Sequence, residues 1–120
     1  MGKATVVIGA SPNSDRYSYK ATVSLQQHGH KVYPVGLREG KIGNLDIITG
    51  KPELKDVDTV TLYVGPQNQA AWENYILSLK PKRIIFNPGT ENDQFMNTAS
   101  ATGIECVEAC TLVMLSIGNF

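Results

Sequence analysis

A short apolar run near the start of the chain breaks at a glycine. Residues 5–8 read Thr-Val-Val-Ile and lead directly into Gly9-Ala10-Ser11-Pro12-Asn13. In α/β proteins this arrangement brings backbone amides, and the positive end of the helix that follows, up to an anion such as a phosphate. The pattern therefore predicts a nucleotide-like ligand at this turn.

The same turn has a second interpretation. The dinucleotide fingerprint needs three glycines at fixed spacing, and here only Gly9 fits, with Ala10, Ser11 and Ser14 in the neighbouring places. Gly9 would allow close backbone approach, Ser11 would add a hydroxyl donor, and Pro12 would stiffen the turn. The alternative is an ordinary strand-to-helix turn without a ligand.

The loop after the second predicted strand bears on which nucleotide would bind. A site for the free ribose of NAD needs Asp or Glu at the end of this strand, whereas the chain reads Pro34-Val35-Gly36-Leu37-Arg38. Because a guanidinium matches phosphate oxygens, Arg38 favours a phosphorylated ribose, as in NADP or coenzyme A, over NAD or FAD. A solvated surface arginine beside Glu39 is the alternative.

Few groups could catalyse a reaction. Cys110 would need thiolate character and access, and because cysteine is usually buried, a structural role is the alternative. Cys106 is expected to point inward on the last strand, and His28 and His30 fall at the edge of the sheet opposite the predicted site. No nucleophile-plus-base arrangement is visible in the sequence. Two cysteines are too few for a disulfide scaffold or a four-ligand zinc site, so both are expected to be free thiols.

Length and charge limit the classes of function that the chain could have. At 120 residues the chain fits one domain, spanning 1–120. The 11 basic and 11 acidic residues balance, so composition indicates neither nucleic acid nor a membrane surface as a partner. No apolar run approaches the ~20 residues of a bilayer span, and the first strand begins too early for a signal sequence. A cytoplasmic protein is expected.

Apolar, β-branched segments alternate with helix-like stretches along the chain. This alternation predicts an α/β, Rossmann-like doubly wound, mostly parallel sheet of five or six strands with helices on both faces. Strands are expected near 4–8, 31–35, 58–64, 82–86 and 104–107, with a further short strand near 45–48. Helices are expected over 16–28, 67–79 and 92–102. The segment 111–117 is either a short helix or a final strand, because periodicity cannot decide so short a run.

Helical spacing predicts which side chains face the core. In the first helix the stripe is Tyr17, Ala21, Leu25 and His28, and in the second it is Trp72, Tyr75, Ile76 and Leu79. The C-terminal segment is apolar and would form a sticky surface if it were uncovered. It could therefore join a second copy of the chain, or a partner protein, through Leu112, Val113, Met114, Leu115 and Ile117.

Several motifs stand in a fixed order along nearly the whole chain. They are Gly9-Ala10-Ser11-Pro12, Tyr33-Pro34-Val35, Gly50-Lys51-Pro52 followed by Val57-Asp58-Thr59-Val60, Asn87-Pro88-Gly89-Thr90-Glu91-Asn92, and Gly103-Ile104-Glu105 leading to Cys110. In this order they resemble the small stand-alone CoA-binding proteins, which are related to the nucleotide-binding domain of the succinyl-CoA synthetase alpha subunit. The resemblance implies a protein that binds coenzyme A or an acyl-CoA and has no evident catalytic centre.

The resemblance also implies where the ligand lies. The pyrophosphate would face Gly9, Ala10, Ser11, Pro12, Asn13 and Tyr17, and the adenosine would face Gly36, Leu37 and Arg38. Val64, Gly65 and Pro66 would wall the groove, Asn87, Pro88 and Gly89 would follow the pantetheine path, and Cys110 would lie near the CoA thiol. The chain departs from the family pattern at Gly36-Leu37, where Asn-Pro is usual, and Arg38 is expected to reach the 3′-phosphate.

Two other functions stay open at this point. The first is a small NADP-dependent oxidoreductase or its cofactor domain, against which stand the missing glycines and the short chain. The second is a protein-interaction subunit whose C-terminal segment docks on another subunit and whose ligand groove is vestigial.

Overall fold

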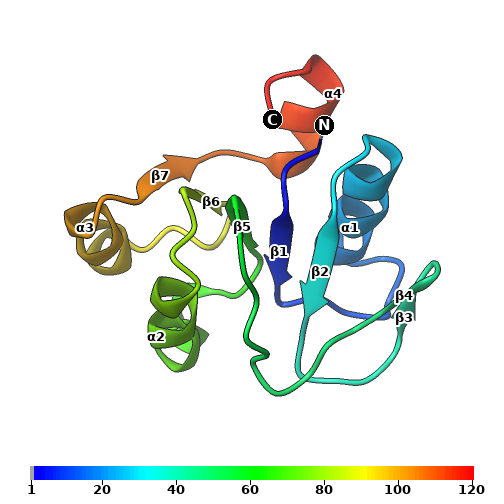
Figure 1. Cartoon of the computed structure of the whole chain (residues 1–120), viewed down its shortest axis with the longest axis horizontal. Helices are drawn as coiled ribbons and strands as arrows, with labels where there is room; N and C mark the ends of the chain where they lie inside the picture. The colour runs from blue at the N-terminus through cyan, green and yellow to red at the C-terminus, as the bar shows by residue number, and fades with distance from the viewer. Residues whose placement is uncertain (1) are drawn as a thin grey trace.

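The computed structural model describes residues 2–120 (Figure 1). In chain order the elements are β1 (Thr5–Ile8), α1 (Tyr17–Gln27), β2 (Val32–Val35), β3 (Lys41–Ile42), β4 (Leu45–Asp46), β5 (Thr59–Leu62), a 3-10 turn η1 (Pro66–Asn68), α2 (Ala70–Ser78), β6 (Arg83–Phe86), α3 (Asp93–Ala101), β7 (Glu105–Glu108) and α4 (Thr111–Ile117). Among these residues, no helix combines the length and apolarity that crossing a bilayer requires.

Within the described part of the chain, the main sheet has five parallel strands in the order β2-β1-β5-β6-β7. The chain passes from β1 to β2 on one side and then returns to β5 on the other, so the strand order reverses beside β1. Ile8 pairs with both Val35 and Leu62, so these three strands end level with one another. The predicted doubly wound α/β fold is confirmed.

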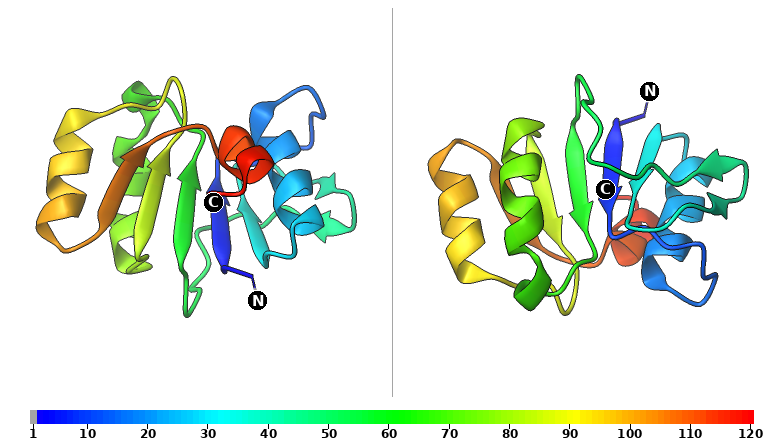
Figure 2. Two further views of the ribbon diagram at one scale, coloured as in Figure 1. Left: turned by 90° about the horizontal axis from the view of Figure 1, so that it is seen from above. Right: turned by 90° about the horizontal axis from the view of Figure 1, so that it is seen from below.

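Helices cover both faces of the main sheet (Figure 2). On one face, Trp72 of α2 and Phe95 of α3 pack in a core with Val6. On the other face, Leu25 of α1 and Leu115 of α4 pack in a core with Val7. Because successive strand side chains point to opposite faces, β1 contributes to both cores and is buried throughout. This is why such strands read as uninterrupted apolar runs in the sequence.

The core-facing stripe predicted for the first helix is wrong at both ends. Ala21 and Leu25 are buried, but Tyr17 is 68% exposed and His28 is an exposed C-cap. The observed buried face is Ser18, Ala21, Thr22 and Leu25. The Thr22 hydroxyl donates to the Ser18 carbonyl at 2.8 Å, which satisfies it inside the core and allows a polar residue on this face. Tyr17 is left exposed at the carboxyl edge of the sheet.

The second helix begins later than predicted. Residues 66–68 form the 3-10 turn, and α2 starts at Ala70, whereas the sequence predicted a helix from residue 67. Its predicted stripe is confirmed, with Trp72, Ile76 and Leu79 buried and Tyr75 half-buried. The third helix, 93–101, lies within the predicted 92–102.

The last segment is a helix, which settles the choice between a helix and a strand. In α4, Met114 and Leu115 are buried, while Val113 is 53% and Ile117 65% exposed. Packing within the chain therefore covers part of the apolar surface that was predicted for this segment.

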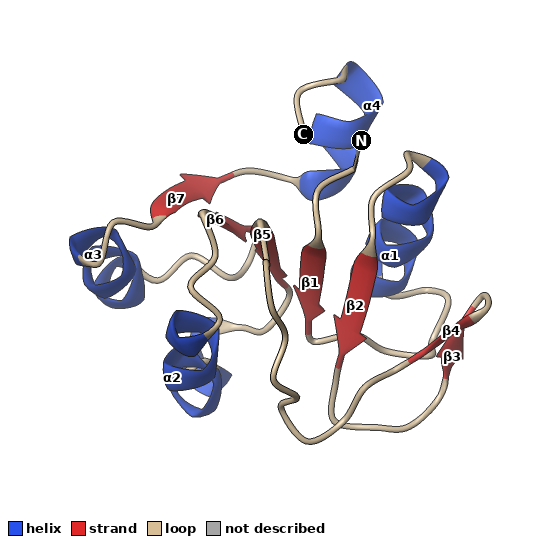
Figure 3. Cartoon of the chain, viewed as in Figure 1, coloured by secondary structure: helices blue, strands red, loops and turns tan. Residues whose placement is uncertain are grey.

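The extra strand predicted near 45–48 does not join the main sheet as a full strand. β3 and β4 form a short antiparallel hairpin, and a long loop then leads to β5 (Figure 3). Ile48 makes an isolated parallel bridge to Val35, and its amide donates to the Pro34 carbonyl at 2.8 Å. This bridge covers part of the outer edge of β2, where unpaired backbone groups would invite another chain.

Candidate functional site

The carboxyl ends of β1, β2 and β5 bring three loops into backbone contact. The amides of Gly9 and Ala10 both donate to the Val35 carbonyl, at 3.0 and 2.9 Å. A Cβ on Gly36 would lie 2.3 Å from the Ala10 carbonyl oxygen, and one on Gly9, whose φ is +95°, would lie 3.0 Å from the Tyr63 carbonyl oxygen. Glycine is required at these approaches because it has no side chain. The predicted glycine turn thus lies where the strand order reverses.

These bonds change which amides are available to a phosphate. Because the Gly9 and Ala10 amides already bond to Val35, they shape the turn, and donors for an anion must lie further along the chain. The Asn13 amide donates to Ser11 Oγ at 3.1 Å, and the Asp15 amide donates to Asn13 Oδ1 at 2.9 Å. The Ser11 and Asn13 side chains therefore stabilise the path from β1 into α1.

Helix α1 begins with unpaired amides. Among residues 2–120, no acceptor receives the backbone N–H groups of Tyr17, Ser18 or Tyr19, and no side chain caps the helix at Arg16. The first turn also lacks an acidic residue. Helix α3 differs, since Asn92 caps it. Unpaired N–H groups and the helix dipole together make the start of α1 electropositive, and neither a capping side chain nor a carboxylate within the first turn balances it.

Exposed charges surround the glycine turn. The basic residues are Arg16, Lys20 and Arg38, and the acidic ones are Asp15 and Glu39. The loop that carries Arg38 packs on the turn, because a Cβ on Gly40 would lie 2.8 Å from the Pro12 side chain. The basic side chains and the α1 amides thus belong to neighbouring loops at one edge of the sheet.

Two large apolar side chains are exposed at this same edge. Leu37, just after β2, is 85% exposed, and Tyr17, at the start of α1, is 68% exposed. Leaving a side chain of this size in water forgoes roughly 1.5–3 kcal/mol of burial free energy. Apolar surface beside unpaired amides and cations suits a ligand that carries both a ring system and phosphates.

Asn87 supports the protein structure. It is 1% exposed. Its Nδ2 donates to Thr61 Oγ1 at 2.7 Å and to a carbonyl of β5 at 2.9 Å, and its Oδ1 accepts from the Thr111 amide at 2.9 Å. These bonds occupy the side chain that the motifs had suggested for the pantetheine path. Pro88 and Gly89, which follow Asn87 directly, are exposed.

Gln69 is a buried polar residue that the sequence interpretation missed. It is 0% exposed. Its Nε2 donates to the Val64 carbonyl at 2.8 Å and to the Thr90 carbonyl at 2.7 Å, and its Oε1 accepts from Asn92 Nδ2 at 3.0 Å. One side-chain amide therefore joins the loops after β5 and β6 to the start of α3. A glutamine three residues before the core-facing Trp72 was the available signal, because that spacing places it on the same helical face.

Tyr63 and Cys110 are neighbours near the ends of β5 and β7. Burial raises the pKa of Tyr63 to about 12, and negative charge at the Cys110 sulfur would add to the rise. The Tyr63 hydroxyl is buried and, within the described chain, lacks a hydrogen bond of good geometry although Thr61 and Thr111 lie beside it. Cys110 is half-buried, so it is neither sealed in the core nor fully accessible.

Both cysteines are free thiols in residues 2–120, as predicted. Cys106 on β7 is half-buried and packs against the core beneath α2 and α3.

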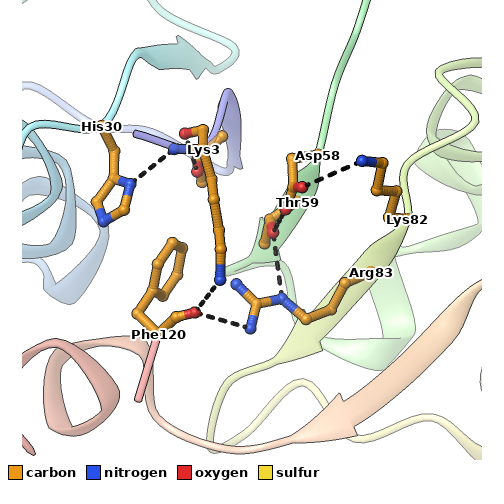
Figure 4. A network of polar contacts seen from close by, with 8 residues as sticks. Lys3, His30, Asp58, Thr59, Lys82, Arg83 and Phe120 are labelled. Atoms are coloured by element: carbon orange, nitrogen blue, oxygen red, sulfur yellow. Dashed lines mark hydrogen bonds and ion pairs between the residues drawn. The ribbon is translucent and has the colours of Figure 1, made fainter. Parts of the chain in front are cut away.

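His30 lies just before β2, at the amino edge of the sheet. Figure 4 shows it beside Lys3 and Phe120. Its Nδ1 accepts from the Lys3 amide at 2.9 Å, and its ring centroid is 4.8 Å from that of Phe120. The Phe120 carbonyl oxygen accepts from Lys3 Nζ and from Arg83, whose Nη1 is 3.2 Å away. Burial lowers the pKa of His30, and the neighbouring cations Lys3, His28 and Arg83 lower it further.

Two cavities, of about 400 and 810 Å³, also lie at the amino edge. The larger is lined by residues 2–4, 54–58, 78–80 and Lys82, and neither includes a residue of the predicted site. A ligand at the carboxyl edge would therefore lie across the loop ends on an open surface. In the part of the chain that the structure describes, no group of three or more His, Cys, Asp and Glu residues could hold a metal ion.

Comparison with known proteins gives a family and a fold. A family model described as "CoA binding domain" matches residues 3–116. A solved structure described as an uncharacterized protein is 52% identical, with a TM-score of 0.97, and the match covers 100% of this chain and 99% of that one. A structure from Thermus thermophilus is 20% identical with a TM-score of 0.85, covering 99% of this chain and 91% of that one. A hypothetical protein from Pyrococcus horikoshii is 23% identical with a TM-score of 0.82, covering 97% and 83%. At such identities the last two show the fold alone, and no curated protein matches the chain.

Proposed function

The chain belongs to the CoA binding domain family, as its sequence motifs indicated, and on that premise we propose that it binds coenzyme A or an acyl-CoA across the carboxyl ends of its parallel strands. The ligand has three parts: an adenosine with a 3′-phosphate, a diphosphate, and a pantetheine arm that ends in a thiol. Each part needs a different kind of surface, and the loops at this edge offer all three.

The unpaired amides at the start of α1 are the main support for this proposal. The unpaired amides of Tyr17, Ser18 and Tyr19 would donate to the diphosphate, and the exposed Arg16 and Lys20 would add positive charge. A hydrogen bond to a charged group contributes about 1.5–3 kcal/mol, so two or three such bonds would anchor the ligand. The turn of Gly9, Ala10, Ser11, Pro12 and Asn13 supplies the shape that leaves this helix end open.

The adenosine would lie over the loop after β2. Leu37 offers an exposed apolar surface for the base, and Gly36 keeps the backbone of this loop close to Ala10. Arg38 is exposed and would pair with the 3′-phosphate.

The pantetheine arm would pass between the loops after β5 and β6. Val64, Gly65 and Pro66 would contact it on one side and Pro88 and Gly89 on the other, with Asn87 fixing the second loop from beneath. Cys110 lies on the chain just beyond β7 and would be nearest the thiol.

Binding without a chemical step is the role we propose. His30 lies at the opposite edge of the sheet, bonded to the Lys3 amide. Tyr63, the titratable neighbour of Cys110, has a pKa of about 12 and is a neutral phenol at neutral pH, which makes it a poor general base for that thiol.

A thermal-shift panel tests the proposal. Coenzyme A, acetyl-CoA, NADPH and NADH would be compared at equal concentrations, because a ligand that binds only the folded state stabilises it by mass action. At 100 times the dissociation constant the stabilisation is about 2.7 kcal/mol, which gives a clear shift in Tm. Stabilisation by coenzyme A or its acetyl ester is expected. Stabilisation by NADPH and not by coenzyme A would instead favour the cofactor domain of an oxidoreductase.

We also propose that α4 contributes a contact between two copies of the chain. Val113 and Ile117 are both more than half exposed on this helix, while Met114 and Leu115 between them are buried. Sedimentation velocity of the wild type and of the Val113→Ser, Ile117→Ser double variant tests this contact. A wild-type dimer that the double variant reduces to monomer supports it, and a monomeric wild type refutes it.

A further inference from the structure

A chain of side-chain hydrogen bonds runs from the end of β5 to the start of α3. Gln69 Nε2 donates to the carbonyls of Val64 and Thr90, Gln69 Oε1 accepts from Asn92, and Asn92 Oδ1 accepts from the Phe95 amide at 3.1 Å. Both N–H groups and the oxygen of the Gln69 side-chain amide therefore have hydrogen-bond partners. Since both partners of the nitrogen are carbonyl oxygens, which only accept, the orientation of this amide is fixed by chemistry.

The two carbonyls that Gln69 holds belong to different loops. Val64 follows β5, and Thr90 follows β6. Thr90 is tied to its own loop, because its amide and its hydroxyl both donate to the Asn87 carbonyl, at 3.0 and 2.7 Å. A shift of either loop would stretch a buried hydrogen bond of Gln69, and an unpaired buried carbonyl is costly.

We propose that Gln69 is a positioning residue that sets the spacing between the loops after β5 and β6 for the pantetheine arm of the ligand. This inference rests on the proposed binding of coenzyme A. Gln69 is completely buried and acts through Val64 and Thr90, so it does not itself contact the ligand. The adenosine and diphosphate would lie on the other loops, those after β1 and β2, with which the Gln69 side chain makes no hydrogen bond in the described chain.

This division of the site yields a test with two ligands. Gln69→Met keeps the approximate length of the side chain and removes all three of its side-chain hydrogen bonds. In titration calorimetry, the variant should bind coenzyme A about tenfold or more weakly, because two carbonyls lose their donor. It should bind adenosine 3′,5′-bisphosphate, which has no pantetheine arm, within about twofold of the wild type, since α1 and the Arg38 loop are untouched. A role limited to overall stability would move both affinities together.

Amide hydrogen exchange without ligand gives an independent readout. In Gln69→Met the Thr90 amide should exchange faster, while the Gly9 and Ala10 amides, which bond to Val35, should be unchanged. Gln94→Met is the matched control, because Gln94 is an exposed glutamine on α3. It should leave both affinities and the exchange pattern as in the wild type.

A second variant covers the case in which Gln69→Met does not fold. Asn92→Ser retains a side chain that caps α3 but is too short to reach Gln69, so it releases one end of the Gln69 amide. It should show the same selective loss in a smaller degree. Equal losses for coenzyme A and the bisphosphate, or unchanged exchange at Thr90, would overturn the proposal. If the wild type binds neither ligand, the proposed function fails, and the exchange arm still decides whether Gln69 holds the two loops together.

Discussion

Replacing Tyr17 with proline removes one of the unpaired amides at the start of α1. Tyr17 is the first residue of the helix, where proline is well tolerated because its fixed φ suits this position. The preceding residue, Arg16, has φ −77° and ψ 143°, the extended conformation that a residue before proline prefers. The helix should therefore form normally in Tyr17→Pro, with one hydrogen-bond donor fewer.

Tyr17→Ala is the control, because it removes the same ring and the same contact with Lys20 but keeps the amide. A hydrogen bond to a charged group contributes about 1.5–3 kcal/mol, and at this exposed site the lower half of that range is expected. The affinity for coenzyme A should thus be about 10–40-fold lower in Tyr17→Pro than in Tyr17→Ala, since 1.4 kcal/mol corresponds to a factor of ten.

Titration calorimetry with coenzyme A measures the difference between the two variants, and urea unfolding confirms that both are folded. Equal affinities in two folded variants would refute the reasoning that the amides of α1 hold the diphosphate.

The other predictions concern the ribose phosphate, the loop packing, the amino edge and the thiol. Arg38→Ala should weaken coenzyme A by about 1.5–3 kcal/mol and dephospho-CoA much less; equal losses in calorimetry would rule out a contact with the 3′-phosphate. Gly36→Ala should lower the free energy of unfolding by about 2–3 kcal/mol, because its Cβ would meet the Ala10 carbonyl at 2.3 Å. A Cβ on Gly43 would meet nothing within 4 Å, although this residue has φ +61°, so Gly43→Ala should lower the free energy of unfolding by only ~1 kcal/mol. Urea unfolding of both variants measures the two losses. Since the pKa of His30 is lowered, the folded state binds fewer protons than the unfolded state just below pH 6.5, so stability should fall as the pH drops through that value. His30→Gln should flatten this dependence, and His28→Gln should flatten it less, because His28 is only one of the groups that lower the pKa of His30; identical slopes in all three proteins would contradict the assignment. Cys110→Ser should leave reversible binding of coenzyme A nearly intact and abolish any covalent adduct seen by intact mass, and an adduct that survives would place the reactive group elsewhere.

The strands and the fold class could be predicted because buried parallel strands leave a strong signal. The run at 5–8 is buried on both faces of the sheet, so it appears in the sequence as an unbroken apolar segment. The face of α1 could not be predicted in the same way. Its buried face includes Ser18 and Thr22, and because these residues are polar, hydrophobic periodicity does not reveal that face. The hydroxyl of Thr22 is satisfied by a hydrogen bond within the helix.

The sequence predicted which loops form the candidate site, but it did not predict the hydrogen bonds that these loops make with one another. The glycines signalled close backbone contacts, and Gly9 and Gly36 do make them. The sequence could not show that the Gly9 amide is used by Val35, or that the Asn87 side chain is turned inward. Such roles depend on which loops meet in space, and this follows from the order of the strands rather than from local sequence.

The amides of Tyr17, Ser18 and Tyr19 offer the most direct test of the central claim, which is that the start of α1 holds the diphosphate. Their resonances would be followed by two-dimensional NMR as coenzyme A is added. If these amides hold the diphosphate, the largest shift changes will occur at these three amides, with smaller changes at the Arg38 loop. The claim would be contradicted if they did not respond, or if the changes centred on Lys55, Asp56 and Lys82 around the cavity at the amino edge.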